Sequence, residues 1–263
     1  MKILSWNING IRAMHKKGAL ADLWVPAYDV LCFQEVKAER DQLDEALHSP
    51  PGYHAYFSHS KGRKGYSGVA IYSRIEPSEV VAGMDGDDDP EGRMLTAFFA
   101  DESGESEGLA LINCYFPNGG RGEERMVYKL DFYKRFLNYC NKLRDDGYTV
   151  IFCGDVNTAH TEIDLARLRE NIDRTGFLPI ERAWIDDVIA NNYVDVFRSL
   201  HPDARDAYTY WDVITRARER NVGWRIDYFF ASSEVMPRIR SCSILADIMG
   251  SDHCPILLDL RWE

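Results

Sequence analysis

The sequence lacks the features that mark a membrane or secreted protein. No apolar run approaches the roughly 20 residues that a membrane-spanning helix needs. No signal-peptide pattern precedes the first predicted strand. The six cysteines form no CxxC pair, and several lie in apolar runs, where a free thiol packs as a small hydrophobe. We therefore expect a soluble, cytoplasmic protein that contacts no membrane.

Basic residues are in the minority, with 31 Lys and Arg against 42 Asp and Glu and a net charge of -11. This balance excludes a nonspecific polycation. A nucleic-acid partner would have to be held by a local basic rim, because the acidic residues elsewhere on the surface repel phosphate.

Linkers, low-complexity tracts and short-period repeats are also absent, so we expect one domain over residues 1–263. A chain of this length can bury a substantial core. The longest amphipathic pattern places Met126, Leu130, Tyr133, Leu137 and Cys140 at spacings of four and three. Helical spacing predicts helices at residues 10–25, 39–47, 123–144, 182–191 and 195–200.

One stretch organises the remaining chemistry, the five residues from Cys153 to Asn157. They follow the apolar run Val150 to Phe152, which is typical of a buried strand that ends at a glycine bend. Asp155 and Asn157 share one face of that strand end, because alternate residues point the same way. An Asx turn would explain the pair without any function.

Polar residues also lie at the ends of five other predicted strands, which strengthens the functional interpretation. These ends carry Asn7, Glu35, Tyr115 with Asn118, Asp227, and the Asp252-His253 pair. Together with the end at Asp155 and Asn157 they make six, which favours one polar centre between two sheets over six separate turns.

These residue types suit metal-assisted phosphate chemistry. Mg²⁺ takes oxygen ligands and few carboxylates, a role that fits Glu35 with Asn7, Asn9 and Asp252. Cys and His show no zinc spacing. A carboxylate beside His253 would favour its charged form, which stabilises a phosphoryl transition state. Asp155 is then the natural general base.

Each of these residues also has an ordinary structural explanation. His253 alone would be a satisfied core or turn histidine. Tyr115 alone would be a strand aromatic in the core. Glu35 could end a buried strand and pair with Lys37 or Arg12. Only the joint occurrence of these residues favours a catalytic site.

Several motifs together make the sequence resemble the exonuclease III-type apurinic/apyrimidinic (AP) endonucleases, within the wider endonuclease/exonuclease/phosphatase superfamily. The resemblance runs from residue 1 to about residue 260 without a large gap. The motifs are Trp6-Asn7 with Asn9 to Arg12, Gln34-Glu35 with Lys37, Gly65 to Gly68, Tyr115 to Gly119, Gly154 to His160, Gly176-Phe177, Glu181-Arg182, Gly223 to Tyr228, and Gly250 to Pro255.

The resemblance implies a fold, an activity and a partner. The fold would be a four-layer α/β sandwich, with two mixed β-sheets packed face to face and helices on the outer faces. The activity would be Mg²⁺-dependent hydrolysis of the phosphodiester 5′ to an abasic site, with Mn²⁺ as a substitute cation. The products would be a 3′-hydroxyl and a 5′-deoxyribose phosphate, and exonuclease and 3′-end-cleaning activities would accompany it. The partner would be duplex DNA with abasic sites or blocked 3′ ends, bound by a monomer.

Site roles follow from the resemblance at matching positions. Glu35 is the principal metal ligand. Asp155 acts on the attacking water, and Asn157 helps to place that water. Asp227 and His253 form a dyad at the scissile phosphate, which Tyr115 and Asn118 also contact. The implied metal set is Asn7, Glu35, Asp155, Asn157, Asp252 and His253. Some relatives have an aspartate where this chain has Asn9, so the metal shell here is less anionic.

The resemblance also implies contacts to DNA. Tyr210, Trp224 and Ile226 match the pocket for the flipped-out sugar, although packing between loops would explain them as well. Arg121 matches an arginine that enters the duplex, and Ile214 an apolar minor-groove wedge. The candidate backbone contacts, which could equally be solvated surface groups, are Arg12, Lys16, Tyr66, Arg93, Asn171 and Arg218.

Two rival functions share most of these residues. A phosphatase of the same superfamily, or a nuclease without abasic preference, would use the same catalytic set but would not need the Tyr210, Trp224 and Ile226 pocket. A catalytically silent DNA-binding module would not need the complete polar set.

Overall fold

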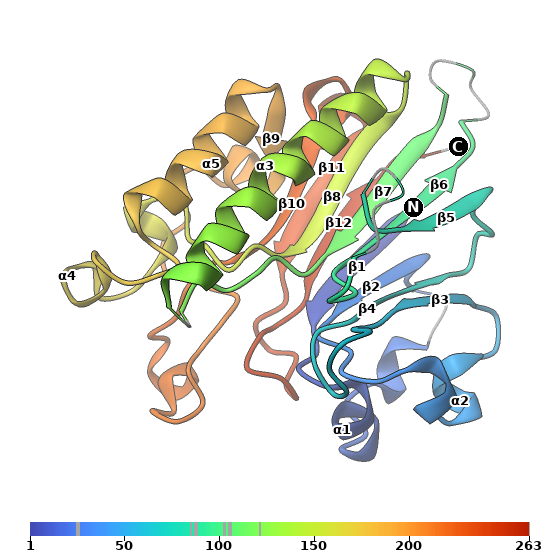
Figure 1. The fold of residues 1–263 in the computed structure, drawn as a ribbon, viewed down its shortest axis with the longest axis horizontal. Coiled ribbons are helices and arrows are strands. Elements are labelled where there is room, and N and C mark those ends of the chain that lie inside the picture. The colour runs from blue at the N-terminus through green and yellow to red at the C-terminus, as the bar shows by residue number, and fades with distance from the viewer. Residues whose placement is uncertain are drawn as a thin grey trace.

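The computed structural model describes residues 1–24, 27–84, 86, 89–101, 104, 107–120 and 122–262. Two six-stranded sheets face each other (Figure 1). The first has the order β11-β12-β1-β2-β4-β3 and the second β5-β6-β7-β8-β10-β9. The strands are β1 (Lys2–Asn7), β2 (Val30–Gln34), β3 (His54–Ser58), β4 (Val69–Ser73), β5 (Glu79–Ala82), β6 (Met94–Phe99), β7 (Leu109–Cys114), β8 (Thr149–Asp155), β9 (Tyr193–Asp195), β10 (Asp227–Ser232), β11 (Ile239–Ile244) and β12 (Ile256–Leu260).

Both sheets are mixed, because β1 pairs in parallel with β2, and β7 with β8, while the other pairs are antiparallel. The helices lie on the outer faces. α3 and α5 cover the second sheet, and α1 and α2 pack against the first (Figure 1). The helices are α1 (Ile11–Lys16), α2 (Glu45–His48), α3 (Glu123–Asp145), α4 (Leu168–Asn171), α5 (Pro179–Ala190) and α6 (Val196–Leu200).

Three apolar layers hold the four structural layers together. The central one joins the facing sheets, with Ile3 and Cys32 on one side and Leu111 and Cys153 on the other. The two outer layers lie between each sheet and its helices. Central strands are therefore buried on both faces, which explains their unbroken apolar runs. The predicted four-layer α/β sandwich is confirmed.

The helix predictions are partly confirmed. The predicted helix at 123–144 is α3. Tyr133, Leu137 and Cys140 of the predicted stripe are buried, whereas Met126 and Leu130 are only half-buried. The prediction of one helix over residues 10–25 is wrong. α1 ends at Lys16, because Gly18 adopts a left-handed φ of 73°. A short 3-10 turn then covers Ala21–Leu23.

The predicted helix at residues 39–47 is also interrupted. Arg40–Gln42 is a 3-10 turn, and Leu43 is extended with ψ 140°, so α2 begins only at Glu45. Among the described residues, no helix is long and apolar enough to cross a membrane.

Candidate active site

Strand ends from both sheets meet along one edge of the sandwich, below the sheets in Figure 1. Asn7 ends β1 opposite Gln34, the last residue of β2, so Glu35 follows beside it. Asp155 ends β8 directly opposite Asp227, which begins the antiparallel β10. His253 precedes β12, and the Trp6 indole N–H donates to its carbonyl at 3.0 Å. The predicted polar centre therefore exists at this edge.

Asp155 is a buried carboxylate with several hydrogen-bond donors. It accepts the Asn157 backbone N–H at 2.8 Å and the Asn7 amide at 2.9 Å. Burial raises its pKa to about 7; the charged His253 ring opposes this shift, and the Asp227 and Glu35 charges add to it. A carboxylate with this pKa can take a proton from water near neutral pH.

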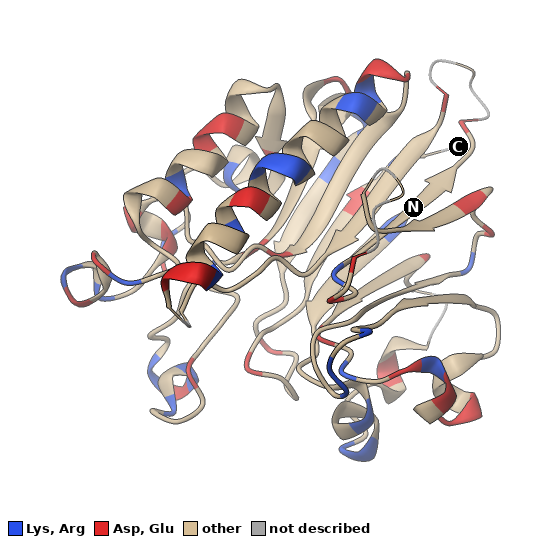
Figure 2. Cartoon of the chain, in the orientation of Figure 1, with Lys and Arg blue, Asp and Glu red and all other residues tan. Residues whose placement is uncertain are grey.

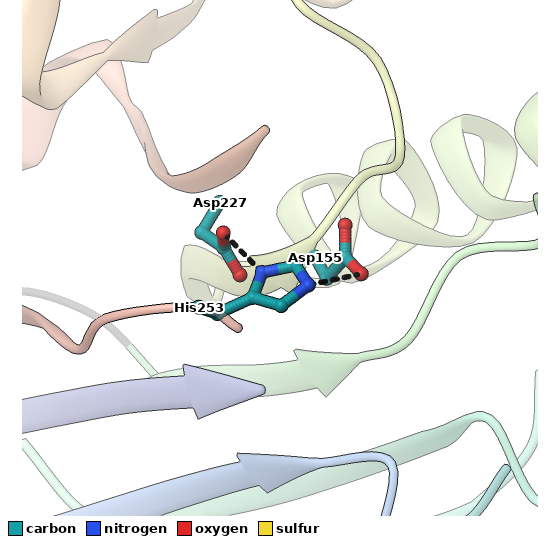
Figure 3. A group of neighbouring side chains, drawn as sticks. All are labelled: Asp155, Asp227 and His253. Carbon is teal, nitrogen blue, oxygen red and sulfur yellow. Dashed lines mark hydrogen bonds and ion pairs between the residues drawn. The ribbon is translucent and has the colours of Figure 1, made fainter. Parts of the chain in front are cut away.

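His253 lies between two carboxylates (Figure 3). Its Nδ1 is 2.8 Å from Asp227 Oδ2, and its Nε2 is 3.8 Å from Asp155 Oδ2. Burial alone would lower the pKa of the ring, but the charges of Asp227 and Asp155 raise it to about 10. The ring is thus an imidazolium at neutral pH, with Nε2–H available to a phosphate oxygen.

Glu35 and Asp252 form the more exposed half of the site. Glu35 accepts the Asn7 amide at 2.9 Å and pairs with Lys37 at 2.7 Å. Asp252 accepts the Asn9 amide at 2.9 Å, and Lys37 in turn contacts the Asn9 oxygen. Glu35 therefore forms the ion pair with Lys37 that its purely structural explanation predicts, and this pair lies within the polar centre.

Oxygen donors of this kind fit a hard divalent cation. Ligand atoms of Asp155, Asp227 and His253 lie within 4.8 Å of one another, and Asn7 bridges Asp155 to Glu35. The Asn7 Nδ2 faces these carboxylates, because its Oδ1 accepts the Asn9 backbone N–H at 3.1 Å. Asn7 and the imidazolium of His253 are thus oriented here as hydrogen-bond donors.

Asn157 and Tyr115 adjoin the carboxylate cluster, and Arg93 packs behind Tyr115. Asn157 has a left-handed φ of 56°, and its Oδ1 accepts the Asn118 amide at 3.0 Å. Burial raises the pKa of Tyr115, with the Glu35 and Asp155 charges adding to the effect, so its phenol stays neutral. The Arg93 guanidinium lies 4.7 Å from the centre of the Tyr115 ring and donates to its carbonyl at 2.8 Å.

The predicted pocket residues lie together, beside the dyad. Tyr210 and Trp224 exchange backbone hydrogen bonds of 2.9 Å, and both pack against the apolar cluster that contains Ile226 and Phe177. The Tyr210 ring is 4.9 Å from the His253 ring. An apolar cluster therefore directly adjoins the charged histidine.

The residues predicted to contact the DNA backbone lie on different elements of the structure. Arg12 is exposed on α1 and donates to the Lys37 carbonyl at 3.4 Å. The Tyr66 hydroxyl accepts from Arg93 and Arg125, each at 3.0 Å. Asn171 ends α4 and donates to carbonyls of its own turn. Arg121 lies outside the described residues. Figure 2 shows Lys and Arg on α1 and on the loop around residues 214–220, along the same edge as the site.

Sequence reasoning missed the buried Lys129, which donates to the Asn157 carbonyl at 2.8 Å. The sequence does contain a signal for it. Lys129 lies three residues after Met126 and four before Tyr133, on the apolar face of α3. A lysine at such a position must find buried partners.

Comparison with known proteins agrees with this geometry. The model of the Endonuclease/Exonuclease/phosphatase family matches residues 4–253. An exodeoxyribonuclease of Bacillus subtilis is 40% identical over 98% of both chains. The DNA repair nuclease APEX1 of Danio rerio is 40% identical over 99% of this chain and 82% of its own. The structure of an AP endonuclease from Archaeoglobus fulgidus superposes with a TM-score of 0.84 at 32% identity, covering 99% of each chain.

Proposed function

This chain belongs to the endonuclease/exonuclease/phosphatase family, and we propose that it cleaves duplex DNA on the 5′ side of abasic sites. It is a phosphodiester hydrolase of DNA repair, like the exodeoxyribonuclease and AP endonuclease relatives. The observation that carries the abasic preference is the contact between the apolar cluster of Tyr210, Trp224 and Ile226 and the ring of His253. A sugar without a base would enter that cluster while its phosphate meets the imidazolium.

In the proposed reaction, water attacks the phosphorus in line with the departing 3′-oxygen. Asp155 accepts the proton of the water, and the Asn157 amide holds the water or a phosphate oxygen. The P–O bond to the 3′-oxygen breaks, and that oxygen leaves with the electron pair and takes up a proton. The products are a 3′-hydroxyl and a 5′-deoxyribose phosphate.

The remaining polar residues stabilise the charge that develops on the phosphate. His253 donates through Nε2–H and is kept charged by Asp227, 2.8 Å away. The neutral Tyr115 phenol and the Asn118 amide are further donors. Mg²⁺, held chiefly by Glu35 with Asp252, would polarise the phosphate and neutralise part of its charge. Asn7 would add an oxygen ligand only with its amide turned over.

The proposed function is tested on a duplex oligonucleotide with one tetrahydrofuran abasic analogue, with Mg²⁺ and with EDTA, beside the undamaged duplex. Mg²⁺-dependent incision just 5′ to the analogue, with the plain duplex mostly intact, supports the proposal. Equal 3′ trimming of both duplexes would make the protein chiefly an exonuclease, the activity in the name of its Bacillus relative. Cleavage of neither duplex would favour a phosphatase, with inositol phosphates as the next substrates.

Loss of the pocket aromatics should reduce the selectivity for abasic sites more than the rate of phosphodiester cleavage itself. Tyr210→Ala combined with Trp224→Ala removes the walls that distinguish a baseless sugar, whereas the catalytic carboxylates remain. We expect the rate ratio of abasic to plain duplex to fall at least about tenfold, since full burial of an apolar group in a pocket is worth about 1.5–3 kcal/mol. Parallel time courses on both duplexes measure the ratio. Equal losses on the two substrates would contradict a pocket role.

The activity should fall at alkaline pH because His253 must stay protonated. Its pKa is raised to about 10, so the cation is present below that pH and is lost as the pH rises through it. Asp227→Asn removes the nearest carboxylate and should shift the alkaline limb of kcat/KM toward neutral pH. A pH profile of both proteins checks this, and an unmoved limb would assign the titration to another group.

A further inference from the structure

A buried ion pair lies behind the catalytic turn, between the two helices that cover the second sheet. Lys129 of α3 and Glu181 of α5 are both 0% exposed, and their charged atoms are 2.6 Å apart. The Lys129 ammonium has three hydrogens and three partners. Besides Glu181 it donates to the Asn157 carbonyl at 2.8 Å and to the Thr158 hydroxyl at 2.9 Å. Two of its three bonds therefore hold the turn that follows Asp155.

The Glu181 carboxylate holds a second segment. It accepts the Thr175 hydroxyl at 3.0 Å and the backbone N–H groups of Gly176 at 2.6 Å and Leu178 at 3.1 Å. Phe177, inside this segment, belongs to the apolar cluster of the pocket. One carboxylate thus fixes the backbone on both sides of a pocket residue.

The two segments also touch each other directly. The Ala159 N–H donates to the Gly176 carbonyl at 2.8 Å. A Cβ on Gly176 would be in van der Waals contact, at 3.4 Å, with both the Asn157 carbonyl oxygen and the Trp224 ring. Gly176 therefore faces both the catalytic turn and the pocket wall, and its hydrogen bond with Ala159 joins the two backbones.

From these contacts we propose that Lys129 and Glu181 are positioning residues, which set the sugar pocket and the Asp155–Asn157 turn at a fixed distance from each other. The proposal rests on the proposed function, since that function requires the sugar and the scissile phosphate to be held at once. Stability alone does not require two buried charges here, because an apolar pair of similar volume is often at least as stabilising. Only the charged pair supplies donors and acceptors to both backbones.

The test is Lys129→Met, with Lys134→Met as a matched control on the exposed side of the same helix. We expect kcat on the tetrahydrofuran duplex to fall at least about tenfold in Lys129→Met, since a misplaced catalytic group loses rate while the substrate still binds. Affinity for the uncleaved duplex in EDTA should stay within about twofold of wild type. The Lys134→Met protein should match wild type in both. An unchanged kcat in Lys129→Met would overturn the proposal.

Lys129→Met leaves a buried carboxylate without its cation and can lose stability for that reason alone. The double variant Lys129→Met with Glu181→Gln removes that stranded charge. If the pair positions the turn, the melting temperature recovers but kcat stays low. The Asn157 carbonyl then keeps the Thr158 hydroxyl as a donor at 2.8 Å, but it has lost the Lys129 ammonium that ties it to α3. Recovery of kcat together with the melting temperature would overturn the proposal.

Hydrogen exchange gives a readout that does not depend on cleavage. Amide exchange should accelerate in residues 154–160 and 174–178 together in the double variant, because the pair fastens both segments. Acceleration in neither segment would overturn the proposal even where the wild-type protein incises the duplex. If the wild-type protein did not incise the duplex but exchange accelerated in both segments of the double variant, the proposed function would be overturned. The positioning of the two segments by Lys129 and Glu181 would still be supported.

Discussion

Asp155→Asn is expected to lower the single-turnover incision rate at least about 10²-fold. The amide has nearly the same shape but cannot accept a proton from water. Asp155 is buried, its pKa is raised to about 7, and its neighbours Asn7 and Asn157 hold the carboxylate in place. Rapid-quench rates on the tetrahydrofuran duplex measure the loss. A thermal melt of the variant shows that the fold persists.

Asp131→Asn provides the control for this substitution. Asp131 is 60% exposed on α3 and pairs with the exposed Arg135 of the same helix at 3.8 Å. It carries the same chemical change and should retain the wild-type rate. An Asp155→Asn protein that melts like the wild type and also cuts like it would remove Asp155 from the general-base role.

Gly154→Ala is expected to have the largest effect on stability. Gly154 lies in β8 with φ 133°, and a Cβ at this position would be 1.9 Å from the Cys114 carbonyl oxygen of the neighbouring strand. The backbone of β7 or β8 must move to admit it. Since overpacking costs typically 1–3 kcal/mol and unfavourable φ adds to it, we expect a loss of about 3 kcal/mol or more. Urea unfolding measures the difference.

Gly62→Ala is the matched control, because no atom lies within 4 Å of a Cβ there and its φ is not in the left-handed region. Its unfolding midpoint should stay close to that of the wild type. If Gly154→Ala unfolded at the wild-type midpoint, the two strands would have to be looser than their contacts indicate. Close packing between β7 and β8 would then not be the reason for a glycine at position 154.

The strand ends of the candidate site could be predicted because two sequence signals coincide there. A central strand such as β8 is buried on both faces and reads as an apolar run, so its polar end at Asp155 stands out. Alternation then places Asp155 and Asn157 on one side. The resemblance supplied what periodicity cannot, namely that the strands form two facing sheets and which ends meet.

Three features of the structure could not be predicted from the sequence, because they depend on contacts or backbone conformations that form only on folding. Lys129 is a charged residue with no strand-end position to mark it, and its burial depends on Glu181, which is 52 residues away. The direction of the Asn7 amide depends on the Asn9 backbone. The break after Lys16 depends on the left-handed φ of Gly18, and glycine tolerates that conformation without requiring it.

The pairing of β1 with β12 has a consequence for how the protein is made. β1 is hydrogen-bonded to β12 as an antiparallel pair, and the Trp6 indole N–H donates to the His253 carbonyl. A ribosome produces Asn7, Glu35 and Asp155 long before it adds Asp227 and His253. A nascent chain therefore carries the proposed general base without the charged histidine. The proposed catalytic centre is completed only when β12 pairs with β1 in the first sheet.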